Sequence, residues 1–241
     1  MEAGDVTKAL VELADPGTID GKARFFKAVP GGYGEGDRFL GVTVPDQRRV
    51  ARRFAELGLD QVRTLLITGA HEERLTALFI LVRKFAKADE ASRKEIIDLY
   101  LADTAAVNNW DLVDSSAFQL LGEWLIDRDR GLLNELAGSQ AWWERRIAIM
   151  ATFAFIRRDD HEWTLRLADK LVHDDHDLIH KAVGWMLREV GERDREAALA
   201  WLARHHRTMP RTMLRYAIEK FDSKLRKEFL AGTISPSTDL P

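Results

Sequence analysis

Apolar residues recur along most of the chain at the three- and four-residue spacing of amphipathic helices. The short alternation of apolar and polar residues that indicates a strand is missing. Glycines interrupt the helical pattern and predict helix ends at Gly58, Gly69, Gly138 and Gly191. The pattern therefore predicts an all-α protein.

One glycine-rich stretch stands apart from the helical pattern. It reads PGGYGEGDRFLG and covers residues 30–41. We expect a loop here, between the first helices and the body of the protein. The stretch does not follow a predicted strand and lacks the lysine of a P-loop, so it does not indicate a nucleotide-binding motif.

A repeat of 35 residues runs through the helical pattern. At this spacing five segments fall into register: residues 75–78, 110–113, 145–148, 180–183 and 215–218. The third and fourth positions are apolar in every segment, and the first two are mostly polar or aromatic from the second segment onward. Such a period without strand signals is typical of a solenoid built from two-helix units, here a HEAT-like α-α superhelix.

The repeat also predicts which side chains share a surface. At about 100° per residue, the first, second, fifth and sixth positions of a segment cover one arc of its helix, and the third and fourth point away. We expect the apolar positions to be buried and the others to line a concave face. That face would collect aromatic, acidic and basic side chains: Trp110, Asp111, Asp114, Arg145, Arg146, His180, Lys181, Trp185, Arg215 and Lys220.

Composition and charge narrow the range of possible functions. The 241 residues carry a net charge of −3, which argues against a general polyanion binder. Arginines nevertheless occur in adjacent pairs, and a local basic strip can bind phosphates on an acidic protein. A solvated helix face is an equally good interpretation of these pairs. Cysteine is absent, which excludes disulfides and thiol catalysis.

Localisation and domain organisation follow from the same survey. The start of the chain has no apolar signal core, and no apolar run reaches the roughly 18 residues of a membrane span. We expect a soluble, cytoplasmic monomer that associates with the nucleoid when it acts. We expect one repeat domain over residues 1–232 and a disordered tail, TISPSTDLP, over residues 233–241.

Two polar segments are weak candidates for chemistry. LVHDDHDLIH has the residue types of a metal site, but a hydrated loop before a helix, with Asp177 as its cap, explains it better. Ser115 and Ser116 have no histidine nearby in the sequence. We therefore expect no metal and no cofactor.

A carboxylate among aromatic residues is the stronger candidate. In NNWDLVDSS, Trp110 and Asp114 are one helical turn apart and share a face. In HKAVGWMLRE, the same spacing groups Lys181, Trp185 and Arg188. The alternative is that both tryptophans are half-buried packing residues.

These segments carry a resemblance to a known family. Together with RFLGVTVPDQRRVAR, AWWERRIAIMATFAFIRR and MPRTMLRYAIEKF, they resemble the AlkD family of HEAT-like DNA alkylation-repair glycosylases over residues 20–230. The resemblance implies lesion contacts by two tryptophans and an aspartate, which fall on Trp110, Trp185 and Asp114, and an arginine nearby, Arg146. The chain departs from the family at Phe25, in place of a tyrosine, and at residues 177–178, in place of an aromatic pair.

The resemblance implies a function and leaves two alternatives. It implies an N-glycosylase for purines alkylated at N3 or N7 in duplex DNA, with phosphates held by a set of basic residues: Arg145, Arg146, Lys181, Arg188 and Arg215. A non-catalytic binder of damaged or branched DNA is the first alternative. A HEAT-type protein-interaction scaffold is the second. Retention of Asp114 between tryptophans favours the enzyme, and the paired arginines favour either DNA function over the scaffold.

Overall fold

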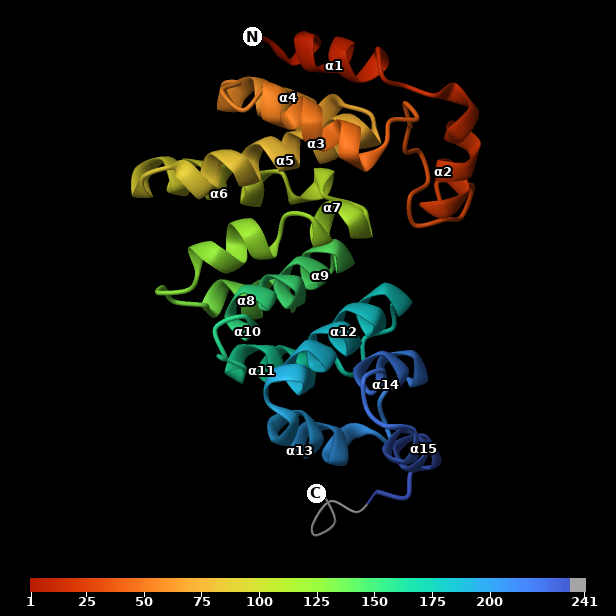
Figure 1. Cartoon of the computed structure of the whole chain (residues 1–241). Coiled ribbons are helices and arrows are strands. Elements are labelled where there is room, and N and C mark those ends of the chain that lie inside the picture. The colour runs from red at the N-terminus through yellow and green to blue at the C-terminus, as the bar shows by residue number, and fades with distance from the viewer. Residues whose placement is uncertain (235–241) are drawn as a thin grey trace. The chain divides into compact units, whose positions relative to one another are not determined.

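The computed structural model describes residues 1–234, and all regular structure within them is helical, as predicted. The chain forms two compact units, Met1–Trp124 and Leu125–Pro241 (Figure 1). The expectation of a single domain stays a prediction. Residues 235–241 of the predicted tail lie outside the described part of the chain. None of the described helices is long and apolar enough to cross a membrane.

The first unit is built around one buried helix. α5 (His71–Lys87) has no exposed side chain among its first eleven residues, and α3 and α4 pack against it. The glycine-rich stretch separates α2 from α3 as a loop, as predicted. The elements of this unit are α1 (Ala3–Val11), η1 (Pro16–Thr18), α2 (Ile19–Phe25), α3 (Val44–Arg53), α4 (Leu59–Thr68), α5, α6 (Glu90–Ala102), η2 (Thr104–Ala106), α7 (Trp110–Asp114) and η3 (Phe118–Gly122).

The second unit is centred on α12 (Asp177–Arg193), which packs against α9, α13 and α14 (Figure 1). Gly184 lies where α12 meets α14. A β-carbon there would come within 2.5 Å of the carbonyl oxygen of Met213, so only glycine permits this approach. The other helices of the unit are α8 (Gly131–Leu136), α9 (Trp142–Ala151), α10 (Phe153–Ile156), α11 (Glu162–Leu171), α13 (Arg195–His205), α14 (Arg211–Ala217) and α15 (Ser223–Ala231).

The 35-residue register is confirmed. Its five segments fall on α5, α7, α9, α12 and α14, with Ile218 as the residue that caps the last helix. The third and fourth positions of every segment are buried, with at most 2% of any side chain exposed. The apolar columns are therefore the side of each helix that packs within its own unit, as the helical geometry requires.

Two of the four predicted helix ends are wrong. Gly69 caps the end of α4, and Gly138 follows α8 closely. Gly58 instead precedes α4 as its N-cap, where glycine is tolerated. Gly191 lies inside α12, because the missing side chain leaves room for close packing: a β-carbon would be 3.3 Å from the β-carbon of Ala198.

The predicted cap of α12 is displaced by one residue. His176 is the N-cap, and its Nδ1 accepts the N–H of Leu178 at 3.2 Å. Asp177 is the first helical residue and pairs with Lys181 across one turn, at 2.7 Å. An imidazole nitrogen thus fills the acceptor role that the sequence assigned to the neighbouring carboxylate.

Candidate functional site

Helix α7 carries two of the three predicted catalytic residues. Buried Asn109 caps it, and the Oδ1 of Asn109 accepts the N–H of Trp110 at 2.9 Å. Trp110 and Asp114 are the first and last residues of this one-turn helix, and both side chains are half-buried. Shortly afterwards the chain enters a π-helical segment at 118–122, a distortion that is frequent at functional sites.

The indole of Trp110 belongs to an aromatic cluster in the first unit. Phe26 stacks on it at 5.6 Å between ring centroids, and Phe25 meets it edge-on at 5.7 Å. Phe25 is 63% exposed, which is unusual for a phenylalanine. The sequence departure at this position therefore keeps an aromatic ring beside Trp110 and loses only the hydroxyl.

A buried phenol lies within electrostatic reach of Asp114. The hydroxyl of Tyr100 is 3.1 Å from the Oγ of Ser116, and the ring is fully buried. Burial raises the pKa of Tyr100 far above its ordinary range, and the negative charge of Asp114 adds to this effect against the hydrogen bond with Ser116. Tyr100 therefore stays neutral and acts as a hydrogen-bonding group only.

His71, at the first position of α5, lies between two carboxylates. Its Nδ1 is 2.7 Å from Oδ2 of Asp37, and its Nε2 is 2.8 Å from Oδ2 of Asp111. The imidazole is 2% exposed. Burial alone would lower the pKa of His71, but the hydrogen bonds to Asp111 and Asp37 outweigh burial and raise it.

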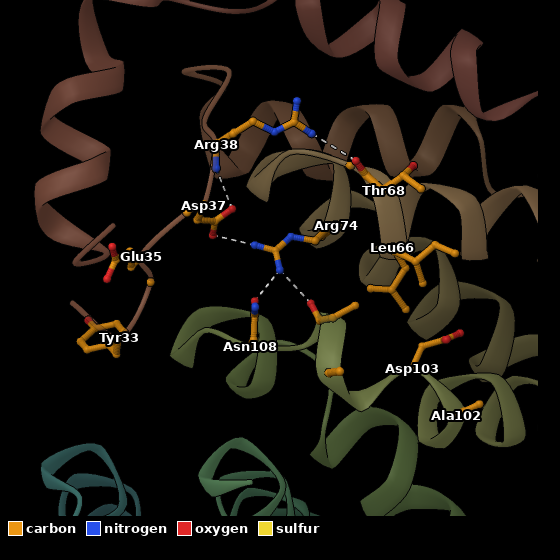
Figure 2. A pocket seen from close by; sticks show the side chains of 16 residues that line it. Tyr33, Glu35, Asp37, Arg38, Leu66, Thr68, Arg74, Ala102, Asp103 and Asn108 are labelled. Atoms are coloured by element: carbon orange, nitrogen blue, oxygen red, sulfur yellow. Dashed lines mark hydrogen bonds and ion pairs between the residues drawn. The ribbon is translucent and has the colours of Figure 1, made fainter. Parts of the chain in front are cut away.

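Arg74 extends this polar group along α5. Its Nη2 pairs with Oδ2 of Asp37 at 2.6 Å, and its Nη1 donates to the carbonyl of Ala106 and to Oδ1 of Asn108 (Figure 2). Burial would raise the pKa of Asp37, yet the hydrogen bond from His71 and the charge of Arg74 lower it overall. These contacts border a polar cavity of about 530 Å³, which the glycine-rich loop helps to line.

Trp185, the third predicted catalytic residue, lies in the middle of α12 in the second unit. Its side chain is half-buried, and its indole N–H donates to Oε1 of Glu189 at 2.7 Å. Phe153 lies 6.4 Å away between ring centroids. Arg188, on the same face of α12 as predicted, pairs with Glu189 and Glu219. The indole is therefore fixed in orientation by a carboxylate one turn away.

The predicted DNA-binding cations differ widely in exposure. Arg146 is 4% exposed, and its Nη1 donates to the carbonyl of Leu178. Arg145 pairs with Asp174 at 2.6 Å and is partly covered. Arg215 is exposed, and its side chain makes no hydrogen bond or ion pair within residues 1–234. The sequence placed these residues on one arc, and the structure divides them into buried, paired and open side chains.

No metal centre is formed by the described residues. Among residues 1–234, no three histidine, aspartate or glutamate side chains are grouped closely enough to hold a metal ion. In the polar segment before α12, Asp174 pairs with Arg145 and accepts the backbone N–H of His176. His176 stacks on Trp142 at 3.7 Å between ring centroids, so this segment is held against α9.

A family comparison decides where the chain belongs. The sequence model of a family described as DNA alkylation repair enzyme matches residues 6–221. The chain belongs to this family. A comparison with functionally curated proteins gave no match.

A solved structure supports the fold of this family member. It is described as a predicted DNA alkylation repair enzyme from Enterococcus faecalis. The two proteins share 13% sequence identity with a TM-score of 0.67, over 87% of this chain and 97% of the other. At this identity the similarity establishes the all-α, solenoid-like fold.

The structure adds residues that the sequence did not single out. His71, Arg74 and Asp37 form a buried polar group, and Asp111 joins it from α7. Sequence separations of 34 and 40 residues hide these contacts from helical periodicity. One sequence feature could have pointed to them: the polar residues HEER stand at the start of α5, which is otherwise an apolar and deeply buried helix of the first unit.

Proposed function

We propose that this protein is a DNA glycosylase that hydrolyses the N-glycosidic bond of purines alkylated at N3 or N7 in duplex DNA. Membership of the DNA alkylation repair enzyme family supports a role in alkylation repair. The observation that carries the finer assignment is the pairing, on the one-turn helix α7, of a half-buried carboxylate, Asp114, with a half-buried indole, Trp110.

The chemistry of the lesion fits such a pair. A purine alkylated at N3 or N7 is cationic, so its glycosidic bond is already weakened and the leaving base needs little acid catalysis. What remains is to stabilise an oxocarbenium-like sugar and to direct a water molecule to it. One ionised carboxylate performs both tasks, and this is the role we assign to Asp114.

Each of the two tryptophans is a candidate contact for the cationic lesion through its ring face. A cation over an indole contributes about 0.5–2 kcal/mol, more when it is desolvated. Trp110 and Trp185 are half-buried, which leaves part of each ring available to a ligand. Phe26 stacked on Trp110 and Glu189 bonded to Trp185 keep the two rings from rotating.

Phosphate contacts would come from basic side chains of the second unit. Arg215 is open to solvent, and Lys181, bound to Asp177, keeps 37% of its side chain exposed. Ammonium and guanidinium groups of this kind position a duplex without reading its sequence. Arg146, buried against the carbonyl of Leu178, would act by supporting the first turn of α12, while Arg145 and Arg188 would contact phosphates from within their ion pairs.

Replacing Asp114 by asparagine tests the assigned chemistry. Asp114→Asn keeps the size of the side chain and removes its charge, so transition-state stabilisation is separated from packing. We expect single-turnover release of 7-methylguanine from duplex DNA to fall by about two to three orders of magnitude, the usual effect of removing one preorganised electrostatic group. DNA affinity should stay within about threefold of wild type.

Asp98→Asn provides the matched control. Asp98 is an exposed aspartate of α6, and among residues 1–234 its one ion-pair partner is Lys94, one turn away. This variant should release base at the wild-type rate, because a surface pair of this kind contributes little. Equal rates of base release for the Asp114 and Asp98 variants would rule out a catalytic role for Asp114. DNA binding without base release by the wild type would favour the non-catalytic binder.

A further inference from the structure

His71 sits at a junction of three segments in the first unit. Asp37 approaches it from the loop after α2, and Asp111 approaches it from α7. Phe26 packs against the imidazole at 4.5 Å between ring centroids, and the same phenylalanine stacks on Trp110. His71 therefore contacts the proposed catalytic helix directly through Asp111 and the indole of Trp110 indirectly through Phe26.

The geometry around His71, between two ionised carboxylates, favours two protons on the ring. A neutral imidazole has one N–H donor and one lone pair, whereas an imidazolium has two donors. Both ring nitrogens lie within 2.8 Å of a carboxylate oxygen. A neutral ring would therefore turn a lone pair toward a carboxylate at hydrogen-bond distance, which is repulsive.

Two other charged groups of α5 lie near the ring. Arg74 pairs with Oδ2 of Asp37, the same oxygen that His71 contacts, and Glu72 is engaged elsewhere. The carboxylate of Glu72 accepts the backbone N–H groups of residues 40–42 and pairs with Lys22 of α2 at 3.5 Å. The local charge is thus two carboxylates, Asp37 and Asp111, against Arg74 and an imidazolium.

We propose that the imidazolium of His71 is a positioning residue for base excision, which holds α7 and the ring of Trp110 in place through simultaneous hydrogen bonds to Asp37 and Asp111. This inference rests on the proposed glycosylase function. The role is structural support of reacting groups, since His71 is buried and has no free nitrogen for a substrate.

The inference predicts that activity falls as the pH rises through the pKa of His71. The pKa of His71 is raised above its ordinary value of about 6.5, so the imidazolium is lost only as the pH rises through this higher pKa. Deprotonation breaks one of the two contacts. Loss of the Asp111 contact loosens α7 itself, and loss of the Asp37 contact loosens the segment leading to Phe39, which also packs on the ring.

The Asp111→Asn variant distinguishes two roles for His71: positioning of α7 that requires an imidazolium, and packing that does not depend on the protonation of the ring. The amide of an asparagine can donate to Nε2 while Nδ1–H still donates to Asp37, so a neutral ring satisfies both partners. We expect this variant to excise 7-methylguanine within about threefold of wild type below the midpoint of the wild-type profile and to lack the fall above it. His71→Gln should be about 10- to 100-fold slower than wild type below that midpoint, as expected for a displacement of reacting groups on the order of 1 Å, and the difference should narrow above it.

The experiment is a single-turnover pH profile of base release for the wild type and three variants between about pH 6 and pH 9. His173→Gln is the control, because His173 is an exposed histidine of the second unit and its loss should leave the profile unchanged. An Asp111→Asn profile that falls with the wild-type midpoint, or a His71→Gln variant as active as the wild type, would overturn the inference.

A second readout does not depend on catalysis. In ¹H–¹⁵N spectra, the indole N–H signal of Trp110, assigned with a Trp110→Phe variant, should shift with the midpoint at which the His71 ring titrates. A wild type that releases no base at any pH contradicts the proposed function. In that case the indole titration decides alone: a shift at the His71 midpoint supports positioning of Trp110, and an unchanged signal overturns it.

Discussion

Trp110 and Trp201 make a matched pair that separates lesion binding from packing. Trp201 on α13 is fully buried, and its indole N–H donates to Oδ1 of Asp169 at 2.7 Å. Trp110 is half-buried and has two aromatic neighbours, Phe25 and Phe26. We expect Trp110→Ala to slow base excision with a small loss of stability. We expect Trp201→Ala to lose much stability while its folded fraction excises normally.

The two magnitudes follow from these surroundings. Two aromatic contacts contribute about 0.5–1.5 kcal/mol each beyond area burial, so the stability cost of Trp110→Ala is at least about 1–3 kcal/mol. Removal of a buried tryptophan such as Trp201 costs about 3–5 kcal/mol. A lost cation–π contact of about 0.5–2 kcal/mol in the transition state lowers excision by about 2- to 30-fold.

Urea unfolding and single-turnover base release, measured on the same preparations, give both numbers. Trp201→Phe should be measured beside Trp201→Ala, because the smaller change leaves an aromatic ring in the core and the protein can still fold. We expect both Trp201 variants to excise 7-methylguanine at nearly the wild-type rate per folded molecule. The reasoning fails if Trp110→Ala unfolds as readily as Trp201→Ala while its folded fraction excises normally, since Trp110 would then be a packing residue.

Two further predictions concern the second unit. Gly184→Ala should lower the free energy of unfolding by about 1–3 kcal/mol, because the added methyl group overpacks α12 against α14. Gly21→Ala, at a helix position with nothing within 4 Å, is the control and should raise it by up to about 1 kcal/mol. Urea unfolding measures both, and equal effects would contradict the close packing at Gly184. Arg215→Ala should weaken duplex binding for every sequence and make the slope of log affinity against log salt shallower by about one unit. Arg157→Ala is the control, because Arg157 is also exposed and is assigned no phosphate contact. An unchanged slope for Arg215→Ala would exclude a phosphate contact at Arg215.

Periodicity predicted the helices and their buried faces well. The columns at Leu112–Val113 and Ile147–Ala148 are fully buried, because 100° per residue determines which side of a helix meets its neighbours. Local glycine rules were less reliable. Gly191 does not end α12, since the space it leaves is used by Ala198 of the next helix, a contact that no local pattern reveals.

Side-chain surroundings were harder to predict than helices. Arg146 occupies the expected position on α9, yet its guanidinium reaches a carbonyl at the start of α12 and is buried there. His71 is invisible to the repeat, because its partners come from a loop and from a one-turn helix far away in the sequence. Trp110 and Asp114 lie on one short helix, as their spacing predicted, because a spacing within one helical turn is a local property.

The identity of the released product tests the central claim most directly. Purified protein should be incubated in excess with duplex DNA carrying a single 7-methylguanine, and the small-molecule fraction and the DNA analysed separately by mass spectrometry. Hydrolysis of the N-glycosidic bond predicts intact 7-methylguanine and one abasic site in equal amounts, with Asp114→Asn releasing far less of both. DNA that is bound but recovered with its alkylated base in place would contradict glycosylase activity.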